Sequence, residues 1–202
     1  MHKKFEFEYE ELDSKEALVG EDLALLDAAF KAVKTAFAPY SKFKVGAAAK
    51  LSNGQIILGS NQESASYPVG ICAERTLLNS IGSQFPKASI ISLAVSYEPV
   101  GKPSNEPLSP CGMCRQSILD YENRYQAPIR IILAGLEGEV MIFQSGSDLL
   151  PFGFNGSISW SLFLYASLSF EPSPLNSYKA DQDAKSFGNT VVPIAAKTLA
   201  SS

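Results

Sequence analysis

The sequence predicts an α/β fold: a three-layer α/β/α sandwich in which helices cover a mixed sheet of five strands. Helix-like and strand-like segments alternate along residues 21–143, and one continuous apolar run is typical of a strand buried on both faces. The last two strand-like runs lie too close together in the chain for a parallel crossover. Hydrophobic residues make up 46% of the chain and charged residues 19%, as in globular proteins.

The first predicted helix spans residues 21–37 and is followed by a β-hairpin. The apolar residues of this helix recur with the spacing of one helix face: Leu23, Leu26, Ala29, Phe30 and Val33. Residues 45–51 and 56–59 are strand-like, and the Asn53-Gly54 pair between them is a strong signal for a tight hairpin turn. We therefore expect these two strands to pair antiparallel.

Two further helices and three further strands complete the predicted fold. Residues 72–81 and 111–121 are helix-like, and Pro110 precedes the second of these helices at a position where a missing N–H is tolerated. Residues 90–97 form the continuous apolar run, and residues 129–134 and 140–143 supply the last two strands. Because only five residues separate these two strands, we expect them to pair antiparallel.

The length of 202 residues is enough for one well-buried domain with additional segments at its ends. We assign this domain to residues 21–155 and interpret residues 1–20 as an N-terminal extension. Residues 156–202 are rich in Ser, Pro, Ala and Asn and show weak periodicity. We interpret them as a C-terminal appendage of unknown role, with disorder as one interpretation.

Charge and hydropathy argue against several classes of protein. The formal net charge is −4 and no run of Lys or Arg is dense, which disfavours a polynucleotide-binding surface and favours a small-molecule ligand. The N-terminus lacks the apolar stretch of a secretory signal. The apolar stretch at residues 158–170 is interrupted by serines and shorter than the ~20 residues that a spanning helix needs. We expect a cytoplasmic protein that binds neither nucleic acid nor membranes.

The chain contains three cysteines, an odd number that indicates metal binding or a reactive thiol more than a disulfide framework. Cys111 and Cys114 are three residues apart, on one face of a predicted helix whose N-terminal dipole stabilises thiolates. Taken alone, this spacing fits half of a zinc site and a redox pair equally well.

Cys72 favours the zinc site, because it also stands at the start of a predicted helix and supplies a third thiolate. Three protein ligands are the number found in catalytic Zn2+ sites, where the fourth position is left for water. The single histidine, His2, lies in the N-terminal extension and is not a credible fourth ligand. We therefore predict an open zinc site formed by Cys72, Cys111 and Cys114.

Glu74 and Arg75 follow Cys72 within the first turn of the predicted helix. An isolated glutamate there would be a capping or surface group, but beside a zinc site a carboxylate can act as general base towards water. Three thiolates on one Zn2+ leave a formal charge of −1, so we expect compensation from Arg75 and from the side-chain donor of Gln116. Arg115 is equally compatible with an ordinary surface arginine.

Two strings of residues carry these groups: Cys-Ala-Glu-Arg at residues 72–75 and Pro-Cys-Gly-Met-Cys-Arg-Gln at residues 110–116. Three shorter motifs accompany them: Ala-Pro-Tyr-Ser-Lys-Phe at 38–43, Val-Gly-Ala-Ala at 45–48 and Asn-Gln-Glu at 61–63. Together they resemble the cytidine deaminase family that acts on free nucleosides, in its three-cysteine, homotetrameric form. The resemblance covers residues 22–151 and implies the fold of that family for residues 21–155.

The resemblance implies zinc-dependent hydrolytic deamination of cytidine and 2′-deoxycytidine to uridine and 2′-deoxyuridine, with release of ammonia, in pyrimidine salvage. Glu74 would take a proton from the attacking water, protonate N3 of the base and then protonate the leaving amine. Glu74 is therefore the expected catalytic residue.

The resemblance also implies contacts with the substrate. Phe43 would pack on the pyrimidine ring, Asn61 and Glu63 would bind the ribose, chiefly its 3′-hydroxyl, and the base edge would meet backbone near Ala73. By its position alone Phe43 could equally belong to the core. Tyr67 resembles an aromatic residue that reaches across a subunit boundary in homotetrameric members, but it could also be an ordinary turn residue before a proline.

The chain also departs from the family near its C-terminal end. Family members often carry a phenylalanine close to the site, and here Phe152 and Phe154 compete for that role. Deamination of another cytosine nucleoside, such as blasticidin S, is an alternative activity for the same zinc site. A non-catalytic, zinc-stabilised binding module and a thiol redox protein are alternatives from other classes.

Overall fold

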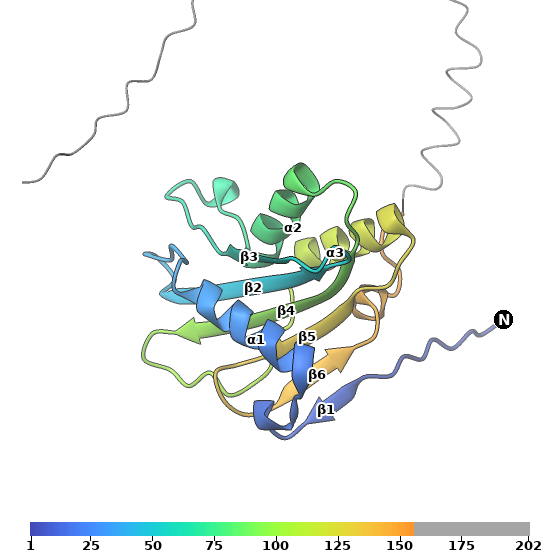
Figure 1. Ribbon diagram of the computed structural model, residues 1–202, viewed down its shortest axis with the longest axis horizontal. Helices are drawn as coiled ribbons and strands as arrows, with labels where there is room; N and C mark the ends of the chain where they lie inside the picture. Colours follow the sequence, from blue (N-terminus) through green and yellow to red (C-terminus); the bar gives the residue numbers. More distant parts are fainter. Residues whose placement is uncertain (156–202) are drawn as a thin grey trace, which may run out of the picture. The chain divides into compact units, whose positions relative to one another are not determined.

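The computed structural model describes residues 1–155, and the predicted appendage at residues 156–202 lies outside the described part of the chain. Six strands form one mixed sheet in the order β1-β6-β5-β4-β2-β3, shown in Figure 1. The strands are β1 (Glu10–Leu12), β2 (Phe43–Leu51), β3 (Ile56–Ser60), β4 (Ile90–Pro99), β5 (Arg130–Ala134) and β6 (Val140–Phe143). β4 and β5 are parallel, and every other neighbouring pair is antiparallel.

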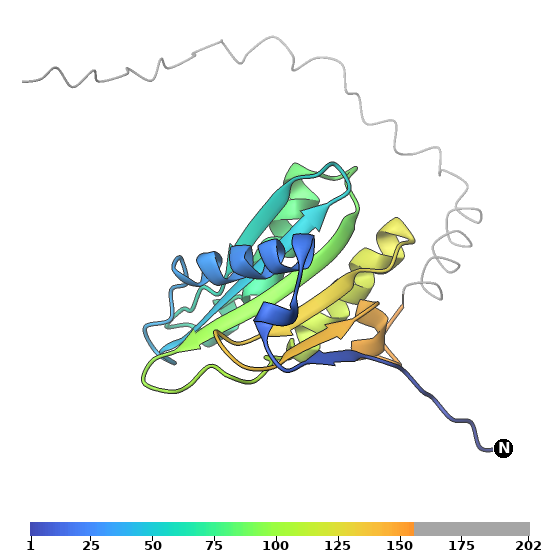
Figure 2. The same ribbon diagram turned by 60° about the horizontal axis from the view of Figure 1, so that its bottom comes forward.

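The helices lie on both faces of the sheet, which confirms the predicted three-layer sandwich. They are α1 (Gly20–Val33), α2 (Ala73–Gln84), α3 (Gly112–Tyr125) and the short 3-10 helices η1 (Lys15–Ala17), η2 (Tyr67–Val69) and η3 (Gly146–Leu149). α1 covers one face, whereas α2 and α3 lie side by side on the other, as Figures 1 and 2 show. None of the helices within residues 1–155 is long and apolar enough to cross a membrane.

Alternate residues of the central strands enter two separate cores. On β4, Leu93 and Val95 pack beneath α2 and α3, whereas Ala94 faces the core beneath α1. On β5, Ile131 and Ile132 divide in the same way. The continuous apolar run at residues 90–97 is explained by this arrangement, since a strand covered on both faces buries most of its side chains; Ile91 is the exposed exception.

The sequence predicts five strands, one fewer than the sheet contains. The sixth strand, β1, lies within the predicted N-terminal extension and pairs antiparallel with β6 through Glu11 and Met141. A three-residue strand that contains two glutamates shows no apolar alternation in the sequence, so only its partner strand reveals it.

The first helix ends at Val33, four residues earlier than predicted. Beyond it the backbone becomes extended, and Phe37 pairs with the segment that follows β3: its N–H donates to the carbonyl of Asn61 at 3.0 Å, and its carbonyl accepts from the N–H of Glu63 at 2.8 Å. Phe37 therefore lies beyond the end of α1, and its backbone holds the segment after β3 in an extended conformation.

The topology brings the N-termini of α2 and α3 to one edge of the sheet. β3 and β4 both pair antiparallel with β2, so they run in the same direction. α2 follows β3 and α3 follows β4, and each helix returns across the sheet from the edge where its strand ends (Figure 1). The start of β2 lies at this same edge, because β2 runs in the opposite direction.

Close backbone approach fixes α2 on the sheet. A Cβ added at Gly59 on β3 would lie 2.5 Å from the carbonyl oxygen of Ala73, the first residue of α2. Only glycine lets the helix start so near the strand, because any side chain would force the two backbones apart.

The carboxylate of Glu122 anchors the last turn of α3. It is 7% exposed and accepts hydrogen bonds from the N–H groups of Ile129, Gly146 and Ser147 at 2.7 to 3.0 Å, and from the hydroxyl of Ser145. One buried side chain therefore ties α3 to the start of β5 and to η3.

Glu122→Gln should lower the free energy of unfolding by about 2–3 kcal/mol, because the amide group turns a donor towards buried N–H groups. The urea midpoint of the metal-loaded protein measures this. The matched variant Glu137→Gln changes an exposed glutamate and should leave the midpoint unchanged. Equal midpoints for the two variants would show that Glu122 has no anchoring role.

Candidate active site

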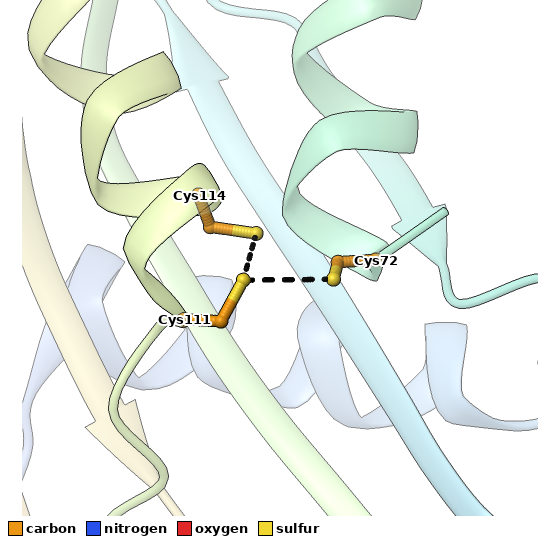
Figure 3. A group of neighbouring side chains, drawn as sticks. All are labelled: Cys72, Cys111 and Cys114. Carbon is orange, nitrogen blue, oxygen red and sulfur yellow. Dashed lines mark hydrogen bonds between the residues drawn. The ribbon is translucent and has the colours of Figure 1, made fainter. Parts of the chain in front are cut away.

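The three cysteines converge where α2 and α3 begin. Cys72 directly precedes α2, Cys111 directly precedes α3, and Cys114 lies in the first turn of α3. The Cys111 sulfur is 3.8 Å from that of Cys72 and 3.5 Å from that of Cys114, and all three sulfurs lie within 4.8 Å of one another (Figure 3). All three are free cysteines.

This spacing fits a single zinc ion. Four-coordinate Zn2+ with Zn–S bonds of about 2.3 Å places its sulfur ligands roughly 3.8 Å apart, close to the distances observed. The three thiols are the one group of three or more potential metal ligands found within residues 1–155. Three thiolates form the donor set of an open site, which agrees with the predicted zinc site.

The positive end of each helix dipole and the neighbouring side chains favour a thiolate at this place. Hydrogen bonds with the thiols of Cys114 and Cys111, together with the nearby Arg75 guanidinium, lower the pKa of the Cys72 thiol to about 6. The hydrogen bond to Cys72 and burial raise the pKa of the Cys114 thiol. Metal binding by thiolates would require Cys114 to lose its proton.

Glu74 lies in the first turn of α2 beside the sulfurs and is 5% exposed. Burial raises the pKa of the Glu74 carboxyl above its ordinary value, and the charge of Cys72 raises it further. A buried carboxyl beside the sulfurs is placed to accept a proton and to return it.

A cavity of about 400 Å3 opens beside Cys72, Cys111 and Glu74. Its size lies within the usual range for small-molecule sites. The walls come from the start of β2 (Ser41, Phe43, Val45), the segment after β3 (Asn61, Glu63), the start of α2 (Cys72, Ala73, Glu74) and the loop before α3 (Leu108, Ser109, Cys111). None of these eleven residues is basic.

Phe43 borders the cavity and is half-buried. Its ring stacks on that of Tyr97 with 5.2 Å between the centroids and 19° between the planes. The structure therefore places Phe43 in the cavity wall, and neither buried core cluster contains it. The buried Ala73 also lines the cavity.

Asn61 and Glu63 both line the cavity, although β3 ends at Ser60 before reaching them. Gln62 between them forms β-bridges to Phe37 and to Ile71, which keep the segment extended and leave the side chains of Asn61 and Glu63 on one side. The amide of Asn61 accepts from the N–H of Val45 at 2.8 Å and donates to the carbonyl of Phe43 at 2.9 Å. Asn61 thereby attaches this segment to the start of β2.

Tyr67 lies outside this cavity, in η2, and its side chain is 80% exposed. It borders a neighbouring cavity that shares Asn61, Glu63 and Cys72 with the first, and its ring meets that of Tyr40 edge-on. The structure therefore places Tyr67 near the site but not within its walls.

Arg75 and Gln116, the two residues expected to compensate the charge of the zinc site, make different contacts. Arg75 lies 4.0 Å from the Met113 sulfur and close enough to Cys72 to lower the pKa of its thiol. Gln116 instead exchanges hydrogen bonds with the backbone of Phe154 at 2.8 and 3.0 Å and donates to Asp120.

Arg115, which the sequence left open between a group near the zinc site and an ordinary surface arginine, joins the loop before α3 to η3. Its Nε donates to the carbonyl of Pro110 at 2.8 Å and its Nη1 to that of Leu149 at 3.2 Å. Phe152 and Phe154 are 91% and 74% exposed, and neither lines the cavity.

Sequence reasoning did not identify Ser41, Leu108 and Ser109 as cavity residues. Ser41 lies in one of the recognised motifs, two residues before Phe43, a spacing at which a serine hydroxyl often bonds a backbone N–H. Leu108 and Ser109 directly precede the second cysteine string and carry no comparable signal.

The family model described as "Cytidine and deoxycytidylate deaminase zinc-binding region" matches residues 20–125. A cytidine deaminase of Halalkalibacterium halodurans is 35% identical over 130 residues, which are 64% of this chain and 91% of the relative. A crystal structure of cytidine deaminase from Burkholderia pseudomallei is similar with a TM-score of 0.56 and 37% identity, over 65% of this chain and 97% of that one.

A second solved structure, cytidine deaminase from Mycobacterium tuberculosis, is similar with a TM-score of 0.53 and 28% identity, over 68% of this chain and 99% of that one. The residues that the family model matches contain α1, β2, β3, α2, β4, α3 and all three cysteines.

Cys114→Ala should reduce bound zinc from about one ion per chain to near zero after dialysis against a weak chelator, because two thiolates cannot hold the ion. Metal analysis of the purified protein measures this. Met113→Leu changes an exposed neighbour in the same helical turn and should retain zinc. A Cys114→Ala protein that keeps a full equivalent of zinc would exclude this thiol as a ligand.

Proposed function

Because the chain belongs to the cytidine and deoxycytidylate deaminase family, we propose that it catalyses zinc-dependent hydrolytic deamination of cytidine and 2′-deoxycytidine. The products are uridine or 2′-deoxyuridine and ammonia. The observation that supports this most is the position of Glu74, a buried carboxyl beside three metal-binding thiols in the wall of a nucleoside-sized cavity.

Cys72, Cys111 and Cys114 would hold a zinc ion, which would supply Lewis-acid activation of a water molecule. Glu74 accepts a proton from the attacking water and gives it to N3 of the cytosine ring, while the water oxygen bonds to C4. Glu74 then carries the remaining proton of that oxygen to the amino group, so that the C4–N bond breaks, ammonia leaves and the C4 carbonyl of the product forms. Arg75 offsets part of the negative charge that three thiolates carry.

The substrate contacts follow from the walls of the cavity. Phe43 packs on the pyrimidine ring, and backbone near Ala73 meets the base edge. Asn61 and Glu63 bind the sugar, chiefly its 3′-hydroxyl. Since none of the residues 1–155 that line the cavity is basic, no described side chain there pairs with a phosphate, which favours a nucleoside over a nucleotide.

The proposed assembly of the protein depends on Tyr67, which lies in the exposed helix η2. We propose a homotetramer in which Tyr67 approaches the site of a neighbouring subunit, consistent with its 80% exposure beside the cavity. A cytoplasmic role in pyrimidine salvage goes with this activity. Gln116 positions Phe154 in this proposal and acts on the zinc site only through α3.

Glu74→Gln should lower kcat for cytidine by about 10²- to 10⁴-fold while zinc content stays at the wild-type level, because the amide cannot move protons. Ultraviolet detection of cytidine loss, paired with metal analysis, measures both quantities. Glu137→Gln should retain wild-type kcat. Near-normal turnover by zinc-loaded Glu74→Gln protein would reject the assignment and would favour a non-catalytic role for the carboxyl.

The wild-type enzyme should deaminate cytidine and 2′-deoxycytidine with kcat/KM at least about 10²-fold above that for blasticidin S or 2′-deoxycytidine 5′-phosphate, because polar partners for the sugar are present and a phosphate partner is absent. Parallel ultraviolet assays of the four compounds test this. Preference for blasticidin S would support the alternative cytosine nucleoside, and inertness towards all four would support a zinc-stabilised binding module.

A further inference from the structure

The carboxylate of Glu63 is held by the turn that precedes β2. Its Oε2 accepts from the backbone N–H groups of Tyr40 at 3.0 Å and Ser41 at 3.2 Å. Its Oε1 accepts a hydrogen bond from the Ser41 hydroxyl. Glu63 therefore faces the cavity with three donors already attached to it.

These contacts leave one acceptor position open. A carboxylate has about four lone-pair positions, two on each oxygen. The two backbone N–H groups occupy Oε2, and the Ser41 hydroxyl occupies half of Oε1. The remaining position on Oε1 can take one further donor, and its direction is set by the Ser41 hydroxyl.

Ser41 also holds Phe43, because its hydroxyl oxygen accepts from the N–H of Phe43 at 3.0 Å. The residue between them, Lys42, has φ of +59°, and within residues 1–155 only Gln126 shares this left-handed conformation among non-glycine residues. Side chains larger than glycine adopt it at a cost, so surrounding contacts must hold the turn in place. The Ser41 hydroxyl and Glu63 supply four such contacts.

We propose that Ser41 is a positioning residue for nucleoside recognition: its hydroxyl aims the open acceptor of Glu63 at the 3′-hydroxyl of the substrate while fixing the Phe43 backbone. This inference rests on the proposed function, in which Glu63 binds the sugar and Phe43 the base. The Ser41 hydroxyl then fixes the distance between Glu63, which binds the sugar, and Phe43, which binds the base.

The state of Glu63 supports this role. The hydrogen bond from Ser41 is the largest cause that lowers the pKa of the Glu63 carboxyl below its ordinary value. An ionised carboxylate is the stronger acceptor for a sugar hydroxyl. Ser41 itself lines the cavity, so its hydroxyl lies at the same wall as the groups it orients.

Steady-state kinetics of Ser41→Ala on cytidine and 3′-deoxycytidine test the proposal, with zinc content measured alongside. KM for cytidine should rise about tenfold with kcat within about twofold, because a misaligned charged acceptor loses most of one hydrogen bond. 3′-Deoxycytidine lacks the donor that Glu63 receives, so its KM should change much less. The preference of the enzyme for cytidine over 3′-deoxycytidine should therefore shrink about tenfold.

Two further variants separate positioning from a general effect on folding. Ser41→Thr keeps the hydroxyl and should restore the wild-type preference. Ser52→Ala removes another exposed serine whose hydroxyl accepts a backbone N–H, that of Ser89 at 3.2 Å, at the opposite end of β2, and should change neither KM. Equal losses on both substrates in Ser41→Ala, or no loss on either, would overturn the proposal.

The wild-type enzyme distinguishes this inference from the activity on which it rests. If wild-type protein does not deaminate cytidine, the proposed function itself is wrong, and the inference is wrong with it. If wild-type protein is active and prefers cytidine, but Ser41→Ala keeps the same preference, only the role of Ser41 is rejected.

Discussion

The site depends on the meeting of two helix N-termini at one edge of the sheet. β3 and β4 run in the same direction because both pair with β2, and α2 and α3 start from the ends of these strands. Cys72 and Cys111 occupy equivalent places, each immediately before its helix. Three thiolates that hold a metal ion there would carry excess negative charge, which the positive ends of both helix dipoles would stabilise.

Contacts with the sheet hold α2 at its first residue and α3 at its last turn. Gly59 allows the first residue of α2 to lie against β3, so the groups that follow it in the first turn have little freedom to move. Glu122 ties the last turn of α3 to β5 and η3, and Arg115 links its first turn to the loop before Cys111. Metal ligands must be held within fractions of an ångström, which rigid elements achieve better than loops.

The burial of Glu74 has opposite effects on the stability of the fold and on proton transfer. A carboxyl that is 5% exposed beside sulfur ligands destabilises the fold, because burial and the charge of Cys72 both oppose its ionisation. The same environment raises its pKa towards the range in which proton transfer is efficient. Perturbed carboxyl groups of this kind gather at functional sites.

The sequence by itself determined the three α-helices, five of the six strands, the two hairpin pairings and the placement of the cysteines at helix starts, because these depend on neighbours in the chain. Apolar periodicity and the Asn53-Gly54 turn are local patterns, and the cysteine strings stand where helices begin. Tertiary structure alone decided the pairing of β1 with β6, the attachment of Gln116 to Phe154 and the contact of Ser41 with Glu63. Each of these joins segments at least 20 residues apart, and a hydrogen bond across such a distance leaves no periodic trace in either segment.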